Sequence, residues 1–237
     1  MTISDQTLVS EIATLVPSSI RVFQRFGIDF CCGGHKPLGD VCEDLRLPLD
    51  EVRRAIESSS ADDGTAVRDW TGEPLPVLIE HIVTVYHDRL REALPRLAEM
   101  AARVARVHGA KAPRLLDRLE AIVGELAADL GQHMRKEEEV LFPAIRALAS
   151  GTAPVMSVPL DSPILVMMRE HDLAGELLAE LRTITDGYTP PEWACATSRA
   201  LYTGLEELER EMHVHVHLEN NVLFPAALRL PALAVAH

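Results

Sequence analysis

The sequence predicts an all-α protein in which a four-helix bundle follows a small helical domain. Aromatic residues make up only 4% of the chain, while alanine, leucine and glutamate are abundant, a composition that favours helix over sheet. Apolar residues recur with a helical period in four long segments, which we place at about 74–107, 113–148, 162–186 and 191–229. Long helices joined by mostly short turns are typical of a bundle.

A shorter unit is expected ahead of the bundle. Residues 1–60 have the apolar spacing of short helices, and Gly27 stands where a helix would end, because glycine readily forms a left-handed C-cap. The cysteines and glycines of 31–34 are expected in a loop. Residues 61–73 begin with a small, polar stretch, which indicates a linker to the bundle at 74–230.

Charge and hydropathy exclude several classes of partner. The formal net charge of -13 argues against a nucleic-acid partner, which would require a basic surface. No apolar run reaches the roughly 18 residues that a membrane span needs. The N-terminus lacks the basic segment of a signal peptide, and the four cysteines, two of them adjacent, show no disulfide framework. We therefore expect a cytoplasmic protein with no membrane partner.

The second and fourth bundle segments share a motif. His-x-x-x-Glu followed by Val-Leu-Phe-Pro occurs at 133–143 and again at 215–225, an offset of 82 positions. Tyr-His-Asp at 86–88 likewise resembles Glu-His-Asp at 170–172, at an offset of 84. One such pair alone is also a common surface feature, but two copies predict an internal duplication that surrounds a pseudo-symmetric site.

Six residues of these motifs have the spacing of a dinuclear metal site. Residues four apart on an α-helix lie about 40° apart around the axis, so the His and Glu of each copy point to the same side. Two carboxylates can bridge two metal ions that each take two imidazoles. Mixed nitrogen and oxygen ligation suits iron or manganese better than copper or zinc. The candidate ligands are His87, His133, Glu137, His171, His215 and Glu219.

Acidic residues near these ligands have two interpretations. Asp129 and Glu211 each precede a paired histidine by one turn, and they either orient an imidazole or belong to a solvated acidic face. Glu170, beside the ligand of the third segment, is a candidate for lining an access channel. Glu138 and Glu139 extend the acidic run and are expected on the surface.

Helix geometry sets the other histidines aside. His213 and His217 lie roughly 120° and 200° from the direction of Glu219, so they should face away from the metals as an exposed pair. The histidines that we assign no metal role are His81, His108 and His237.

These motifs resemble those of the repair-of-iron-centres family, whose members are hemerythrin-like di-iron proteins. The resemblance rests on Tyr-His-Asp-Arg at 86–89, His-Met-x-Lys-Glu-Glu at 133–138, Glu-His-Asp at 170–172, Leu-Glu-Asn-Asn-Val-Leu-Phe-Pro at 218–225 and Cys-Cys-Gly-Gly at 31–34. It implies a hemerythrin-like bundle that binds two non-haem iron ions through the same six residues, with both glutamates and an oxo or hydroxo group as bridges. It also implies a role in restoring iron–sulfur clusters damaged by nitric oxide or peroxide.

Cys31 and Cys32 are adjacent, and the strained ring that they would form disfavours a disulfide between them. A helix beginning near Pro37 would lower the pKa of these thiols through its dipole. We expect the pair to sense redox state, relay iron or accept nitrosyl species, with two ordinary thiols in a turn as the alternative. Cys42 and Cys195, each isolated on a helical pattern, are expected to pack in the interior.

Three functions are compatible with these residues. The first is repair, in which a labile di-iron pair donates iron to damaged iron–sulfur proteins, and the cysteine pair favours it because a gas carrier does not need one. The second is an enzyme that reduces nitric oxide. The third is a module that binds or senses O2 or nitric oxide without turnover. The sequence leaves turnover, the client protein and the oligomeric state open, with a homodimer among the alternatives.

Overall fold

The computed structural model describes residues 3–59, 68–152 and 159–230, and the regular structure of these ranges is helical without strands. The prediction of an all-α fold is therefore confirmed. Residues 61–67 of the predicted linker lie outside the described residues. No described helix is both long enough and apolar enough to cross a membrane.

Backbone contacts divide the chain into two compact units. Within the described residues, one consists of 3–59, 68–79 and 213–230, and the other of 80–152 and 159–212. The boundary near residue 212 falls inside one continuous helix, α10 (Ala196–His217), so this helix contributes to both units.

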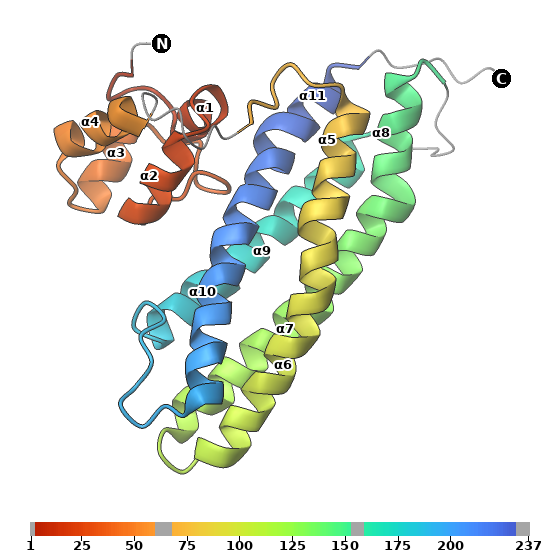
Figure 1. The fold of residues 1–237 in the computed structure, drawn as a ribbon. Helices are drawn as coiled ribbons and strands as arrows, with labels where there is room; N and C mark the ends of the chain where they lie inside the picture. The colour runs from red at the N-terminus through yellow and green to blue at the C-terminus, as the bar shows by residue number, and fades with distance from the viewer. Residues whose placement is uncertain (1–2, 60–67, 153–158, 231–237) are drawn as a thin grey trace. The chain divides into compact units, whose positions relative to one another are not determined.

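The first unit begins with four short helices: α1 (Val9–Leu15), α2 (Ser19–Phe26), α3 (Leu38–Asp44) and α4 (Leu49–Ser59) (Figure 1). Their apolar faces meet in a core that contains Ile12, Phe23 and Phe30, all without exposed surface. α2 ends as predicted at Gly27, whose φ of 67° is a left-handed conformation that glycine adopts without strain. Most of α5 (Leu75–His81) and all of η4 (Leu218–Leu223) and α11 (Phe224–Leu228) also belong to this unit.

The second unit is a four-helix bundle. Its elements are η2 (Ile82–His87), α6 (Asp88–His108), α7 (Pro113–Lys136), η3 (Glu137–Leu141), α8 (Phe142–Ala149), α9 (Asp161–Ile184) and the first part of α10. α6 packs on α7, and α7 packs on α9. Arg182 of α9 donates to the buried Glu209 of α10 over 3.1 Å. Gly204 of α10 lies so close to α6 that a Cβ there would be 2.7 Å from Leu97 Cδ2. These four contacts close the ring of the bundle.

All four long helices that the sequence predicts are present, although the fourth begins at Ala196 rather than near residue 191. Three of them contain a π-helical turn that the periodicity did not predict: η2, η3 and η4. Pro143 and Pro225 follow η3 and η4 closely. A proline ring collides with the carbonyl four residues earlier and supplies no N–H to it, so these two prolines disfavour a regular α-helical turn just before them.

Candidate metal centre

Three of the six predicted ligands lie on the π-helical turns. His87 is the last residue of η2, Glu137 the first of η3, and Glu219 the second of η4. A π turn takes up an extra residue and so re-aims the side chains around it, which is why such turns are frequent at functional sites. The other three ligands come from regular turns of α7, α9 and α10: His133, His171 and His215. All six residues are at most 2% exposed.

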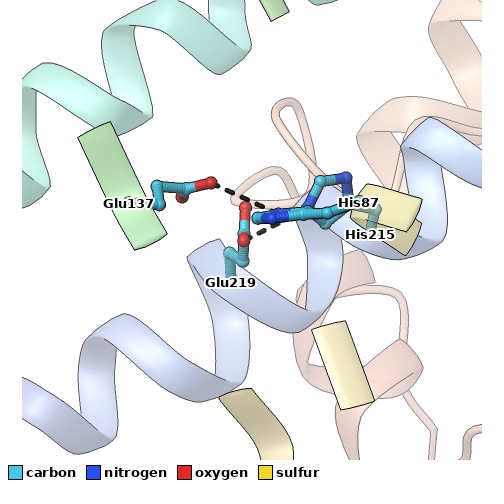
Figure 2. A group of neighbouring side chains, drawn as sticks. All are labelled: His87, Glu137, His215 and Glu219. Atoms are coloured by element: carbon cyan, nitrogen blue, oxygen red, sulfur yellow. Dashed lines mark hydrogen bonds and ion pairs between the residues drawn. The ribbon is translucent and has the colours of Figure 1, made fainter. Parts of the chain in front are cut away.

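The candidate ligand atoms form two groups that share both glutamates. One group holds His87, Glu137, His215 and Glu219, and the other holds His133, Glu137, His171 and Glu219. Within each group the ligand atoms lie within 4.8 Å of one another, which is close enough for a single cation to contact them all. Figure 2 shows the first group, with both carboxylates directed toward the two imidazoles. Two cations held in this way would have both carboxylates in common.

Short distances between ligand atoms support this arrangement. His133 Nε2 and His171 Nε2 lie 2.9 Å apart. Two nitrogens that each lie about 2.1 Å from one ion, at a right angle, would be about 3 Å apart. His215 Nε2 lies 3.1 Å from Glu219 Oε1.

The carboxylate of Glu137 is the group that most needs a cation. Its side chain is fully buried, and neither oxygen accepts a hydrogen bond from a described residue. Oε2 lies 3.4 Å from His87 Nε2 and 3.3 Å from His133 Nε2. A buried carboxylate without a donor is costly unless it is paired or coordinates a metal. Imidazole nitrogens and carboxylate oxygens without thiolate form a donor set that fits iron.

Two further carboxylates bind the Nδ1 atoms of two candidate ligands, on the side of each imidazole away from the metal site. Glu138 Oε1 lies 2.6 Å from His87 Nδ1, and Glu170 Oε2 lies 2.9 Å from His133 Nδ1. An ionised carboxylate only accepts hydrogen bonds, so each Nδ1 donates and each Nε2 keeps its lone pair for the site. Glu138 was predicted as a surface residue, and its side chain is 25% exposed, but its contact with His87 was not predicted. The constant offset could have pointed to this position, because the corresponding residue of the second copy, Asn220, is also polar.

Glu170 lines a pocket on the side of the bundle. The pocket has a volume of about 220 Å³, and its polar lining includes His133, Lys136, Glu170 and Asp129. Burial would raise the pKa of Glu170, but hydrogen bonds from Lys136 and His133 outweigh burial and lower it, so the carboxylate is ionised at neutral pH. Of the two acidic residues with an open interpretation, Asp129 thus lines the pocket, whereas Glu211 pairs with an exposed arginine over 3.0 Å.

Asp29 organises the Cys-Cys-Gly-Gly loop of the first unit. Its carboxylate accepts bonds from the main-chain N–H groups of Cys31, Cys32 and Gly33 at 2.9, 3.1 and 2.8 Å. Gly34 is required for close approach, because a Cβ there would lie 2.6 Å from a main-chain carbonyl oxygen. The loop is therefore a defined turn whose two thiols have different environments.

The Cys31 thiol is buried and donates to Asp29 over 3.2 Å, while Cys32 is half-buried. A hydrogen bond with Cys32, burial and the charge of Asp29 raise the pKa of Cys31 well above its ordinary value. A helix does begin close to Pro37, at Leu38, but the expected lowering of the thiol pKa is wrong for Cys31.

His217 and Asn221 contact Phe30, and Asn221 also contacts the main chain of Cys31. Asn221 Nδ2 lies 3.3 Å from the Cys31 carbonyl oxygen, 3.4 Å from that of Phe30 and 3.1 Å from His217 Nδ1. The rings of His213 and His217 both meet Phe30 edge-on. Burial lowers the pKa of His217 to about 4, so this imidazole is neutral. The prediction of an exposed pair is wrong for His217, which packs against the core of the first unit.

The remaining cysteines differ from each other. Cys42 packs in the core of the first unit, as predicted. Cys195 is exposed, so the prediction that it packs in the interior is wrong. Its sulfur lies 3.5 Å from Ser198 Oγ and 3.3 Å from His108 Nε2. Hydrogen bonds from Ser198, and then from His108, lower the pKa of Cys195 to about 6.

Comparisons with known proteins identify relatives of the chain. The hemerythrin HHE cation binding domain matches residues 78–227, which contain all six candidate ligands, and ScdA_N, a domain of unknown function, matches residues 5–60. The chain is 40% identical to the iron-sulfur cluster repair protein YtfE of Yersinia pseudotuberculosis (serotype IB, strain PB1/+) and to that of Yersinia pestis (strain Pestoides F). Each comparison covers 92% of this chain and 95% of the relative. The chain therefore belongs to the hemerythrin HHE family and, within it, to the family of the iron-sulfur cluster repair protein YtfE.

Proposed function

We propose that the chain holds two iron ions and donates iron to damaged iron–sulfur clusters. The observation that carries the proposal is the pair of buried groups that share Glu137 and Glu219. One ion would be held by His87 and His215, the other by His133 and His171, with both glutamates as bridges. The printed name of the relatives, iron-sulfur cluster repair protein, supports the choice of task.

The donor set suits an ion that must be both held and released. Carboxylate and imidazole ligands without thiolate suit ferrous iron, which is the metal that a damaged cluster lacks. The bundle shields the six ligands from water, so a leaving ion needs a path. The pocket beside His133 offers one, because the ionised Glu170 and neighbouring Asp129 attract cations. We assign Glu170 the role of a channel residue on this path.

The cysteine pair would act as a relay for iron or as an acceptor of nitrosyl species. Since Cys31 is buried and its raised pKa keeps it protonated at neutral pH, the half-buried Cys32 is the thiol that meets a partner first. The proposed partners are damaged iron–sulfur proteins of the cytoplasm, with nitric oxide or O2 as small ligands.

A reactivation experiment tests the proposal against its alternatives. Iron-loaded protein is incubated without air with an enzyme whose [4Fe–4S] cluster has been nitrosylated, and recovered activity is followed together with nitrous oxide. Recovery is expected. Nitrous oxide without recovery would favour nitric oxide reduction, and neither product would favour a module that only binds gas.

Two controls sharpen the comparison. The metal-free protein mixed with the same amount of free ferrous iron shows whether delivery depends on the loaded site. Metal analysis of the loaded protein should give about two irons per chain, as expected for a carboxylate-bridged pair in a helical bundle. A value far below this would contradict the proposed site.

A further inference from the structure

The side chain of Glu138 connects a buried ligand to an arginine at the surface. Glu138 Oε1 lies 2.6 Å from His87 Nδ1, and Arg91 Nη2 donates to both oxygens of the same carboxylate. Arg91 Nη1 in turn donates to Asp88 over 2.7 Å. The exposed fraction of the side chain rises from 0% at His87 through 25% at Glu138 to 44% at Arg91. The contacts thus lead from the metal-facing imidazole to solvent.

Helix geometry explains how these residues meet. Arg91 follows His87 by four positions at the start of α6, so the two side chains share one face. Glu138 reaches between them from η3, one residue after Glu137. Glu137 Oε2 lies 3.4 Å from Nε2 of His87, while Glu138 binds Nδ1 of the same ring. The two consecutive glutamates therefore contact opposite nitrogens of one imidazole.

We propose that Glu138 is a positioning residue for the cation at His87 and that Arg91 holds it in place. As an acceptor, the Glu138 carboxylate keeps the proton on Nδ1 and leaves the lone pair on Nε2. As an anion, it makes the imidazole a stronger ligand. Arg91 Nη2 donates to both carboxylate oxygens while Nη1 is held by Asp88, so that Glu138 neither swings into solvent nor turns toward the cations.

The contact between Arg91 and Glu138 acts mainly on the orientation of the His87 imidazole and contributes little to the stability of the protein. An ion pair as exposed as Glu138 and Arg91 stabilises a protein little by itself. Its effect on His87 is larger, since the orientation of a buried ligand depends on the carboxylate that the pair immobilises.

The other supported imidazole has a different outer partner. Glu170 binds His133 Nδ1 through one oxygen and pairs with Lys136 through the other. An ammonium group is a point charge without the planar fork of arginine, so the two supports are not equivalent. Loss of Glu138 should therefore affect one of the two cations and leave the other unchanged.

Iron release and spectroscopy test the inference, which rests on the proposed function because it takes the cations to be iron. The variants E138A and E138Q are compared with E139Q, which alters the exposed neighbouring glutamate of the same turn. Each protein is loaded with ⁵⁷Fe without air, and its release to a chelator and its Mössbauer spectrum are measured. In E138A, half of the iron should leave about 10- to 100-fold faster than in wild type, the loss typical of such supporting carboxylates.

The spectra separate positioning from general loosening. One of the two iron signals should change in E138A, and E138Q should lie between E138A and wild type, because its amide oxygen still accepts from Nδ1 without the negative charge. E139Q should match wild type. R91Q should shift the same signal as E138A by a smaller amount, and an R91Q protein identical to wild type would overturn the role of Arg91.

Several results would overturn the inference. E138A could match E139Q in release and spectrum, or both ions could leave equally faster, which would indicate a loosened bundle. If E138A does not fold, the nearly isosteric E138Q carries the same comparison. A wild-type chain that takes up no iron overturns the proposed function as well, whereas a wild-type chain with two irons and an unaltered E138A overturns this inference alone.

Discussion

Asn221 lies two residues beyond Glu219 and directs its side-chain amide at the main-chain carbonyl of Cys31, 3.3 Å away. The turn that carries a candidate bridging carboxylate therefore also binds the loop that carries the two thiols. Glu219, Asn221 and Cys31 all belong to the first compact unit. A movement of η4 on loading or loss of a cation would reach this loop through the Asn221 amide, beside the contact of the His217 ring with Phe30.

Asn221→Ala should make the loop thiols more reactive. The change removes the amide that reaches two carbonyls, and a hydrogen bond contributes about 1 kcal/mol net, so alkylation of Cys31 and Cys32 should accelerate about 5- to 30-fold. Timed iodoacetamide labelling read by mass spectrometry measures the rates. Cys42, buried in the core, is the internal control. Equal rates in variant and wild type would show that Asn221 does not hold the loop.

Replacing Cys31 and Cys32 together by serine should leave the iron content of the bundle intact while impairing cluster repair, because neither thiol belongs to the buried ligand groups. Iron analysis and the reactivation assay measure the two quantities. Cys195→Ser is the matched control, since this thiol is exposed and outside the proposed relay. Full repair by the double variant would remove the relay from the proposed function.

Glu170→Gln should slow iron uptake several-fold, because it removes an ionised carboxylate from the pocket beside His133. Stopped-flow absorbance during anaerobic addition of ferrous iron measures the rate. Glu176→Gln changes an exposed residue of the same helix by the same charge. Uptake slowed equally in both variants would indicate a long-range charge effect rather than a specific path.

Glu137→Gln should stabilise the metal-free protein and abolish most iron binding. In the absence of a cation the buried carboxylate accepts no hydrogen bond from a described residue, and such an unsatisfied group costs about 1–3 kcal/mol. The free energy of unfolding of the metal-free variant should rise by about this amount. Urea unfolding and iron analysis measure the two effects, with Glu139→Gln as control. A variant that is less stable without metal would contradict the free-energy cost assigned to the buried Glu137 carboxylate.

Alkylation of Cys195 should have its midpoint near pH 6, because hydrogen bonds lower the pKa of this exposed thiol to about 6. The sign follows from the reactive species, since the thiolate is present above the pKa and disappears as the pH falls through it. Ser198→Ala removes the largest of the stabilising hydrogen bonds and should move the midpoint upward. A wild-type midpoint near 8.5, the value of an unperturbed cysteine, would contradict this environment.

The duplication made much of the candidate site predictable from the sequence. Two copies of one motif at a constant offset restrict which histidines can be equivalent, and the six residues selected in this way are the ones whose ligand atoms the structure brings together. The motif also indicated the long helices, because its apolar residues keep the helical period. Comparison within the chain therefore supplied information that a single helix could not.

The features that were missed depend on contacts or on irregular turns. A helical wheel assigns about 100° to each residue, which separates Glu138 from the face of Glu137, yet both residues reach His87 from η3. The helical wheel showed that His217 points away from Glu219. It could not show that Phe30, far earlier in the chain, packs against His217. Cys195 stands directly before α10, where an apolar pattern gives no guide to exposure.

Anyone who transplants this site into a designed bundle would have to copy more than six side chains. Writing His-x-x-x-Glu onto an ideal α-helix reproduces the spacing of His133 and Glu137 but leaves Glu138 aimed away from the imidazole that it holds here. The Phe-Pro pair must be copied too, since Pro143 lies in the first turn of α8, directly after the irregular turn, and supplies no main-chain N–H there. The transferable part is thus the whole segment 133–143, with its irregular turn built in.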